Sequence, residues 1–258
     1  CTIPEIPREL DPAAFDQLLS LTYIPAPDTI FAAVKKLPPA HYFIQHKGDM
    51  SVRRYWDIPV GEKIDINMTE AKALTLQKIE EAVRIRLMSD VPLGAFLSGG
   101  LDSSLIVALA SRHISGSLDT FSIGFENPAY NELPFAREVA RTFNTYHHEF
   151  MVTPLEVDAL PQLVRHFGEP YGDFSALPLW RLAEETRKHV TVALSGDGGD
   201  ELFAGYKRHR MFHVYNTFRR ILPEKLVGLA TQIVGLPRSG NPMARRIQRF
   251  FQMIHQPP

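Results

Sequence analysis

Cysteine is almost absent from this sequence: Cys1 is the only one among 258 residues. A single cysteine excludes a disulfide framework within the chain and is typical of proteins from a reducing compartment, so we expect a cytoplasmic protein. The sequence also has no run of 18 apolar residues and no basic-then-apolar leader. It therefore predicts neither a membrane span nor a signal peptide.

Excess charge is lacking as well, since the formal net charge is only −1. Such a balance gives no whole-chain indication of a nucleic-acid partner. Repeats and low-complexity tracts are absent. Apolar residues make up 45% of the chain, which is enough to fill a sizeable core in one or two domains.

What the sequence does contain is a glycine- and serine-rich segment from Ser98 to Ser104. It follows an apolar run at 91–97, which predicts a buried strand, and it opens a helical stretch that ends near His113. Adjacent glycines let the backbone turn and let a ligand come close to the main chain. Three hydroxyls and the helix N-terminus offer donors to an anion, so the segment predicts a polyphosphate site.

Asp102 lies among these expected phosphate-binding groups, and the segment lacks the lysine that ends an ATPase P-loop. A carboxylate repels phosphates unless a cation lies between them, so Asp102 predicts Mg²⁺. The alternative is that two glycines after a strand form a plain turn.

A second strand, turn and helix pattern begins at 190–194 and continues from Ser195 and Gly196 to Tyr206. Its turn crowds three carboxylates into five residues: Asp197, Asp200 and Glu201. Like charges this close favour a divalent cation or an ammonium group. The alternative is a solvated helix start, where acidic residues are common.

The segment Ser98–Ser104 resembles the pyrophosphate loop of the N-type ATP pyrophosphatases. Its pairing with 195–206 resembles the synthetase domain of class B, glutamine-dependent asparagine synthetases. Further segments that look like this family lie at 23–31, 36–42, 54–57 and 168–178. The resemblance covers about Leu18 to Arg210, three-quarters of the chain.

The resemblance implies an ATP- and Mg²⁺-dependent ligase. Such an enzyme adenylates the side-chain carboxylate of aspartate, releases pyrophosphate and forms asparagine with ammonia derived from glutamine. The metal ligands implied are Asp102 and Asp200, and the catalytic residues implied are Asp102, Asp197, Asp200 and Glu201. The residues implied to bind the nucleotide are Leu97, Ser98, Gly99, Gly100, Asp102, Ser103, Ser104, Ile123, Ser195 and Gly196. A second copy of the chain, in a homodimer, is a further candidate partner, whereas nucleic acid and membrane are not.

Members of this family carry a glutaminase domain ahead of the synthetase domain. We expect residues 1–57 to be the end of the glutaminase domain, most of which is missing here. We expect residues 58–258 to be the synthetase domain, truncated before a helical region that supplies a lysine in the family. The residues after Cys1 do not resemble the family's catalytic Cys-Gly start, so we expect Cys1 not to be the glutaminase nucleophile. Asp197 also stands where several members have glutamate.

The periodicity of the sequence predicts the same architecture. The expected strands are 91–97, 118–125, 146–152 and 190–194, and the expected helices are 70–88, 104–113, 133–143 and 178–188. Their alternation predicts an α/β fold, a doubly wound parallel sheet with helices on both faces, as in the ATP pyrophosphatases. The proline-rich stretch ahead of it is expected to be irregular, with a hairpin formed by 41–44 and 51–56. Thr69 is the expected cap of the first helix.

Other residues are weaker candidates. His147 and His148 are neighbours on a strand and face opposite ways, which favours structural roles over one shared metal ion. Glu169 and Asp173 either touch the amino-acid substrate or shape a turn. From Tyr206 to Pro258, ten Lys and Arg stand against one acid, for a net charge of +9. Apolar residues interleave with them, which favours amphipathic helices over a nucleic-acid surface.

Three other functions are considered for this chain. It could be another adenylating amide-forming enzyme of the same family, either β-lactam synthetase-like or polysaccharide-linked, because the two loops serve ATP rather than the acceptor. A sulfur-transferring tRNA enzyme is disfavoured because it needs reactive cysteines. The third alternative is a nucleotide-binding fragment without turnover.

Overall fold

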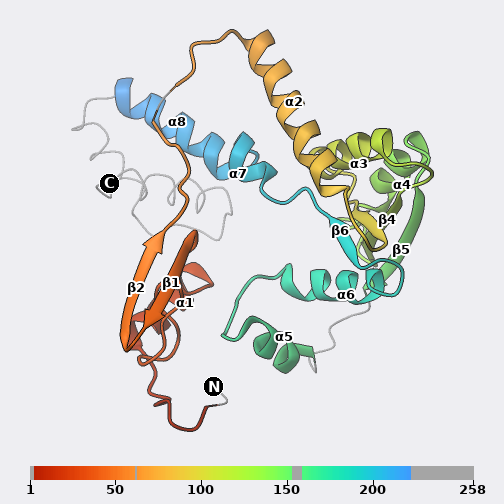
Figure 1. The fold of residues 1–258 in the computed structure, drawn as a ribbon. Coiled ribbons are helices and arrows are strands. Elements are labelled where there is room, and N and C mark those ends of the chain that lie inside the picture. The colour runs from red at the N-terminus through yellow and green to blue at the C-terminus, as the bar shows by residue number, and fades with distance from the viewer. Residues whose placement is uncertain (1–2, 62, 153–158, 222–258) are drawn as a thin grey trace, which may run out of the picture. The chain divides into compact units, whose positions relative to one another are not determined.

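The computed structural model describes residues 3–61, 63–152 and 159–221 (Figure 1). The chain divides into two compact units, Cys1–Gly196 and Asp197–Pro258. The predicted sheet and both flanking layers of helices belong to the first unit.

A parallel sheet of four strands forms the centre of the first unit, in the order β5-β4-β3-β6. The strands are β3 (Leu93–Phe96), β4 (Asp119–Phe125), β5 (Tyr146–Val152) and β6 (Val192–Leu194). Every pairing between neighbours is parallel. The first strand of this sheet, β3, therefore lies between β4 and β6, so the strand order reverses there.

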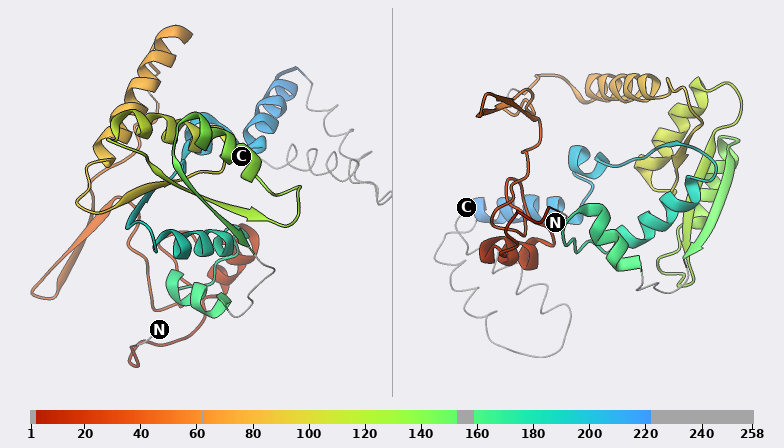
Figure 2. Two further views of the ribbon diagram at one scale, coloured as in Figure 1. Left: turned by 90° about the vertical axis from the view of Figure 1, so that its right-hand side faces the viewer. Right: turned by 60° about the horizontal axis from the view of Figure 1, so that its bottom comes forward.

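Helices cover both faces of this sheet, which confirms the predicted doubly wound α/β class. On one face, residues of α2 (Met68–Arg86), α3 (Leu101–His113) and α4 (Leu133–Thr142) join Ala95 and Leu97 in one apolar cluster. On the other face, Leu182 of α6 (Ala176–Thr186) packs with Phe121. The left view of Figure 2 shows the strands between these two layers. Because alternate strand residues point to opposite faces, β3 contributes to both clusters, with Ala95 in the first and Phe96 against the second.

Two helices differ from the sequence prediction in how they begin. Asn67, not Thr69, caps α2, since its side chain accepts hydrogen bonds from the backbone of Thr69 and Glu70. Glu70 returns a bond to the Asn67 backbone and completes a capping box. On α2, Val83 is buried whereas Leu74 is exposed. The helix α6 begins at Ala176, two residues ahead of the predicted start at Pro178.

Two helices were missing from the prediction. One is α5 (Leu160–Phe167), which ends at Gly168 and packs on α6. The other is α1 (Pro12–Leu21), which lies in the proline-rich stretch expected to be irregular. The Asp11 side chain caps α1 by accepting from the backbone of Ala13 and Ala14, and proline occupies its first turn, where no N–H is needed.

The predicted hairpin is present as β1 (His41–His46) and β2 (Asp49–Arg54), which pair antiparallel. Nearly all of its residues are exposed, on both faces. The two strands form a sheet of their own, separate from the four-stranded sheet.

The second unit begins with α7 (Gly199–Phe203) and continues with α8 (Lys207–Ile221). The helix α8 agrees with the helices predicted from the basic C-terminal stretch, and residues 222–258 lie outside the described residues. Across the described part of the chain, no helix has the length and apolar character that a bilayer span requires.

The packing around Phe121 yields a first prediction. Its side chain is fully buried between the sheet and α6, so Phe121→Ala is expected to lower the free energy of unfolding by about 3–5 kcal/mol. Urea unfolding measures the change. The matched control is Phe174→Ala, because Phe174 is 95% exposed and the same truncation there should cost less than about 0.5 kcal/mol. Equal losses in both variants would contradict the assigned core.

Candidate functional site

The segment that follows β3 is held in shape by its own serines. The Ser98 and Ser103 hydroxyl oxygens lie 2.9 Å apart, and the Ser98 backbone N–H donates to Ser103 Oγ over 3.3 Å. The Gly100 N–H donates to Ser98 Oγ over 3.1 Å. Ser103 is buried and also donates to the Gly100 carbonyl, so its hydroxyl braces the loop from within.

The free donors of this loop lie at the start of α3. Gly100 is the residue before the helix, and among the described residues no side chain caps it. The first-turn N–H groups of α3 are thus not closed off by a capping side chain. Ser98 is exposed, and Asp102 and Ser104 are half-buried. These groups form a surface that suits an anion.

Two glycines allow neighbouring segments to close around this loop. Gly99 has a φ of 80°, and a Cβ there would lie 2.6 Å from the backbone of Phe135 and Ala136 in α4. A Cβ on Gly196 would lie 2.7 Å from the backbone nitrogen of Ser103 and 3.0 Å from the carbonyl carbon of Asp102. The chain leaving β6 therefore lies directly against the first turn of α3, and only glycine fits at this point.

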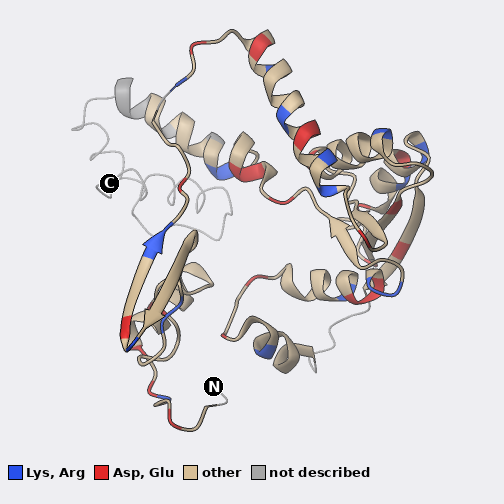
Figure 3. Ribbon diagram, in the orientation of Figure 1, with Lys and Arg blue, Asp and Glu red and all other residues tan. Residues whose placement is uncertain are grey.

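Both loops leave the carboxyl ends of neighbouring strands, β3 and β6, where the strand order reverses. In open α/β sheets this reversal opens a crevice in which ligands bind. The residues of both strands are uncharged, and the carboxylates of both motifs come after the strands end (Figure 3). The sheet thus brings the two sequence motifs together up to Gly196.

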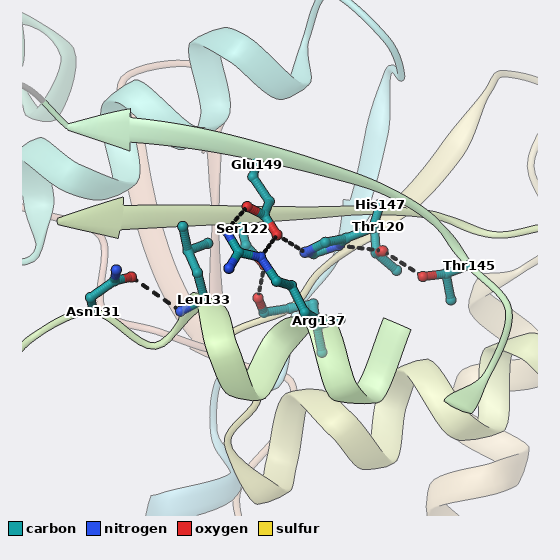
Figure 4. A network of polar contacts seen from close by, with 9 residues as sticks. Thr120, Ser122, Asn131, Leu133, Arg137, Thr145, His147 and Glu149 are labelled. Carbon is teal, nitrogen blue, oxygen red and sulfur yellow. Dashed lines mark hydrogen bonds and ion pairs between the residues drawn. The ribbon is translucent and has the colours of Figure 1, made fainter. Parts of the chain in front are cut away.

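A network of polar contacts lies between α4 and the strands β4 and β5, next to the segment Ser98–Ser104 (Figure 4). The buried Ser122 hydroxyl donates to the Leu97 carbonyl, and the Leu97 N–H donates to the Phe121 carbonyl over 2.8 Å. Asn131 accepts from the Leu133 N–H over 3.2 Å at the start of α4. These bonds fix both the last residue before the loop and the helix that touches Gly99.

The same network contains Arg137, which donates twice to the Glu149 carboxylate over 2.7 Å. This pair lowers the pKa of Glu149 and raises that of Arg137. His147 Nδ1 lies 2.9 Å from Thr120 Oγ1, whereas His147 Nε2 lies 3.6 Å from Glu149, which is too long for a hydrogen bond.

The neighbouring His148 points to the opposite face, where its Nε2 lies 2.9 Å from an oxygen of Asp119. Within residues 3–61, 63–152 and 159–221, no three His, Cys, Asp or Glu side chains are gathered as a metal site. Both histidines therefore have structural partners, as the strand alternation indicated.

In the second unit, the acidic turn has its own internal contacts. Tyr206 donates to Glu201 over 2.5 Å, and the Arg208 guanidinium lies 4.3 Å from the Tyr206 ring centre. The Tyr206 hydrogen bond lowers the pKa of Glu201, which keeps that carboxylate ionised. The Gly205 N–H donates to the Asp200 carbonyl over 3.0 Å, while Asp197 is exposed at the start of the turn.

Three predicted nucleotide-binding residues lie at or near the carboxyl ends of the strands. Leu97 is buried and its backbone is paired inside the sheet, as described above. Ile123 is half-buried near the end of β4, where its side chain joins the apolar cluster around Phe121. Ser195 is half-buried between β6 and Gly196.

A cavity of about 580 Å³ lies at the ends of β4 and β5, against α5 and α6. Its walls are mainly apolar, with Phe125, Leu163 and Phe167 among them. Asp173 lines it too, and accepts from the backbone and the hydroxyl of Ser175 over 2.8 Å each. These bonds lower the pKa of Asp173, so the carboxylate shapes the turn before α6 and stays ionised at the cavity wall.

Sequence reasoning missed two contacts near the site. Ser122 could have been found, because Thr120 and Ser122 are polar residues at alternate positions in the mainly apolar stretch 120–125. The ion pair between Lys36 and Glu169 had no such signal, since each lies alone in an irregular segment.

Comparison with known families accounts for both loops. The asparagine synthase family model matches residues 75–255, a range that contains both motifs. The chain belongs to the asparagine synthase family. A second family model, that of the glutamine amidotransferase domain, matches residues 1–56. The resemblance to glutamine-dependent asparagine synthetases inferred from the sequence is thus confirmed.

Individual relatives agree with this assignment. Asparagine synthetase [glutamine-hydrolyzing] 1 of Bacillus subtilis is 39% identical over 83% of this chain and 34% of its own length. Putative asparagine synthetase [glutamine-hydrolyzing] 2 of Methanocaldococcus jannaschii is 39% identical over 76% of this chain and 38% of its own length. The chain therefore spans little more than a third of either relative. Among solved structures, the NH3-dependent NAD synthetase of Campylobacter jejuni aligns with a TM-score of 0.34 and 14% identity, over 75% of this chain and 98% of that chain.

The buried His147 yields a prediction about pH. Burial lowers the pKa of His147 more than the Glu149 carboxylate raises it. The unfolded chain therefore takes up a proton at higher pH than the folded protein does, and the free energy of unfolding should fall as the pH drops below about 6.5. Urea unfolding between about pH 7.5 and about pH 5.5 measures this slope.

His147→Gln removes the titrating group and should flatten the slope. The control is His46→Gln, because His46 is exposed on the hairpin and should leave the slope as it is. An unchanged slope in His147→Gln would show that another group causes the pH dependence.

Proposed function

We propose that this chain is the nucleotide-binding part of an ATP-dependent amide ligase that converts aspartate to asparagine. The observation that carries the proposal is the contact between Gly196 and the backbone of Asp102 and Ser103, which joins the two family motifs at the reversal of the strand order. Family membership and the names of the relatives support the same chemistry.

In this proposal the loop Ser98–Ser104 binds the β- and γ-phosphates of ATP. The donors are the exposed Ser98, the half-buried Ser104 and the N–H groups of the first turn of α3. Ser103 keeps these donors in place through its bonds to Ser98 and Gly100. Because pyrophosphate leaves with added negative charge, donors fixed before the reaction favour its departure. Leu97, Ile123, Ser195 and Gly196 are the residues proposed to lie nearest the rest of the nucleotide.

Asp102 and Asp200 are the proposed ligands of a Mg²⁺ ion, which would neutralise phosphate charge when bound. Carboxylate oxygens suit this ion, and Mg²⁺ is usually held by one or two carboxylates together with substrate phosphates. The donor set fits that mode, in which no group of three protein ligands is needed. Asp102 is half-buried beside the proposed phosphate donors, which suits this role.

The acidic turn is proposed to serve the second step of the reaction, in which ammonia is used. Asp197 directly follows Gly196 in the sequence and is exposed, and its carboxylate is proposed to attract the ammonium ion or ammonia that is the second substrate. Glu201, kept ionised by Tyr206, adds to this negative charge.

The reaction has two balanced steps. A side-chain carboxylate oxygen of aspartate attacks the α-phosphorus of ATP, which forms β-aspartyl-AMP and expels pyrophosphate. Ammonia then attacks the acyl carbon, loses a proton to solvent or a carboxylate, and expels AMP to give asparagine. The adenylate is needed because a free carboxylate would have to lose oxide.

The ammonia is proposed to come from glutamine, hydrolysed by a glutaminase domain whose last part is residues 1–57. The match of the glutamine amidotransferase model to residues 1–56 supports this division. Residues 58–258 are then the synthetase domain, and homodimerisation of the whole protein stays a proposal. A related adenylating amidotransferase is the second candidate, because both loops would serve ATP in the same way.

The role of Asp102 generates a testable prediction. Asp102→Asn keeps the size of the side chain but removes the charge, so it should weaken Mg²⁺-dependent ATP binding at least about tenfold, or about 1.4 kcal/mol. Isothermal titration with and without Mg²⁺ measures this. Asp49→Asn is the matched control, since Asp49 is exposed in the hairpin. Equal ATP affinity of wild type and Asp102→Asn in Mg²⁺ would refute the assignment.

The acceptor is tested by ATP–pyrophosphate exchange on the full-length protein with a panel of carboxylates. Aspartate should drive exchange, because its adenylation is reversible and the reverse step forms ATP from added pyrophosphate. Glutamate and asparagine should give at most about a tenth of the aspartate rate. Faster exchange with a carboxyethyl amino acid or a sugar acid would assign the protein to the second candidate function. Absence of exchange with every acid would reject the ligase altogether.

A further inference from the structure

The segment from Thr22 to Lys36 is tied to a loop far along the chain, Gly168 to Phe174. The Lys36 ammonium donates to the Glu169 carboxylate and, over 2.6 Å, to the Ile24 carbonyl. A second tie lies at the other end of the loop, where the Gly172 N–H donates to the Thr22 carbonyl over 2.8 Å. The loop is thus held at two points by one short segment.

The ion pair is partly shielded from solvent. The side chain of Lys36 is 30% exposed and that of Glu169 is 17% exposed. The second carboxylate oxygen of Glu169 is buried, and within the described residues it has no hydrogen-bond partner. Lys36 is therefore the main group that compensates the charge of Glu169, and without it the carboxylate would have to move toward water.

The loop that these ties hold forms one wall of the cavity at the ends of β4 and β5. Tyr171, Gly172, Asp173 and Phe174 all line that cavity, and α6, which follows the loop, packs on both strands. A shift of Glu169 toward water would move this wall, since Gly172 is only three residues farther along.

The wall has a chemical character of its own. Asp173 presents an ionised carboxylate in a mainly apolar lining, and the carboxyl group of Glu126 belongs to the same lining. This combination favours a ligand with a cationic end and an otherwise uncharged contact surface. The ammonium end of an amino-acid acceptor meets that description better than the phosphates of ATP do.

We propose that Lys36 is a positioning residue, which holds the Gly168–Phe174 wall so that the cavity binds the ammonium end of the acceptor. The proposal rests on the function proposed above. It also gives a role to the segment matched by the glutamine amidotransferase model, which extends to residue 56. Part of that segment is thereby a structural element of the synthase site.

The first test measures the wall itself and does not depend on catalysis. Hydrogen–deuterium exchange of the backbone amides at 168–174 should be at least about tenfold faster in Lys36→Met than in wild type, because both ties loosen. Lys36→Arg keeps the charge and should restore most of the protection. The matched control is Lys35→Met, which breaks the neighbouring exposed pair with Asp28 and should leave this loop unchanged.

The second test uses the full-length protein and the acid that drives exchange best. Lys36→Met should raise the KM for that acid at least about fivefold and change the KM for ATP less than about twofold. Glu169→Gln should have the same effect, and the double variant should be no worse than either single one, since both remove one shared interaction.

The proposal would be overturned if the hydrogen–deuterium exchange at 168–174 were the same in Lys36→Met as in wild type. Equal changes in the KM for the acid and the KM for ATP would overturn it too. A circular dichroism spectrum like that of wild type shows that each variant is folded, and Lys36→Arg still decides if Lys36→Met is not. If no acid drives ATP–pyrophosphate exchange, the ligase proposal fails. The hydrogen–deuterium exchange at 168–174 still decides whether Lys36 holds the wall.

Discussion

The arrangement of the site depends on a close contact between two backbones, that of Gly196 and that of the first turn of α3. Side chains can be exchanged for others of similar shape, but main chains can approach this closely only where a Cβ is missing on one of them. The neighbouring positions of β3 and β6 provide the approach, and the glycine allows it. The hydrogen bonds among Ser98, Gly100 and Ser103 then hold the first turn of α3 where it contacts Gly196. Loss of this single contact would separate the donors of the first loop from Gly196, where the second motif begins.

Below the loop, the protein places hydroxyl groups where an apolar core would be simpler to pack. Thr120 and Ser122 are almost completely buried in β4, and each has a hydrogen-bond partner. The Leu97 carbonyl explains one of them, because it lies at the end of a strand and needs a donor once water is excluded. A hydroxyl from the next strand supplies that donor. The buried polar layer thus follows from ending a central strand at a binding loop.

The sequence predicted the features that local patterns encode. Both loops, their strands and the helices α3, α4 and α6 between them follow from apolar periodicity and glycine-rich turns. The helix α1 was missed even though Asp11 and Pro12 form a standard start, because the many prolines nearby favoured an irregular reading. The pair of Lys36 and Glu169 could not be predicted, since the partners are 133 residues apart and neither segment has a period. Burial, which makes that pair matter, is a property of the folded chain alone.

The hairpin of β1 and β2 has a consequence for how the protein behaves on its own. Among the described residues, each strand pairs only with the other in their two-stranded sheet, so each has one edge without a strand partner there. Phe43, Ile44 and Val52 are about half exposed, which leaves apolar groups on both faces. Such a ribbon accepts a further strand along either edge, whether from its own protein or from a neighbour. The hairpin is therefore a template for association, open to a partner strand along its edges.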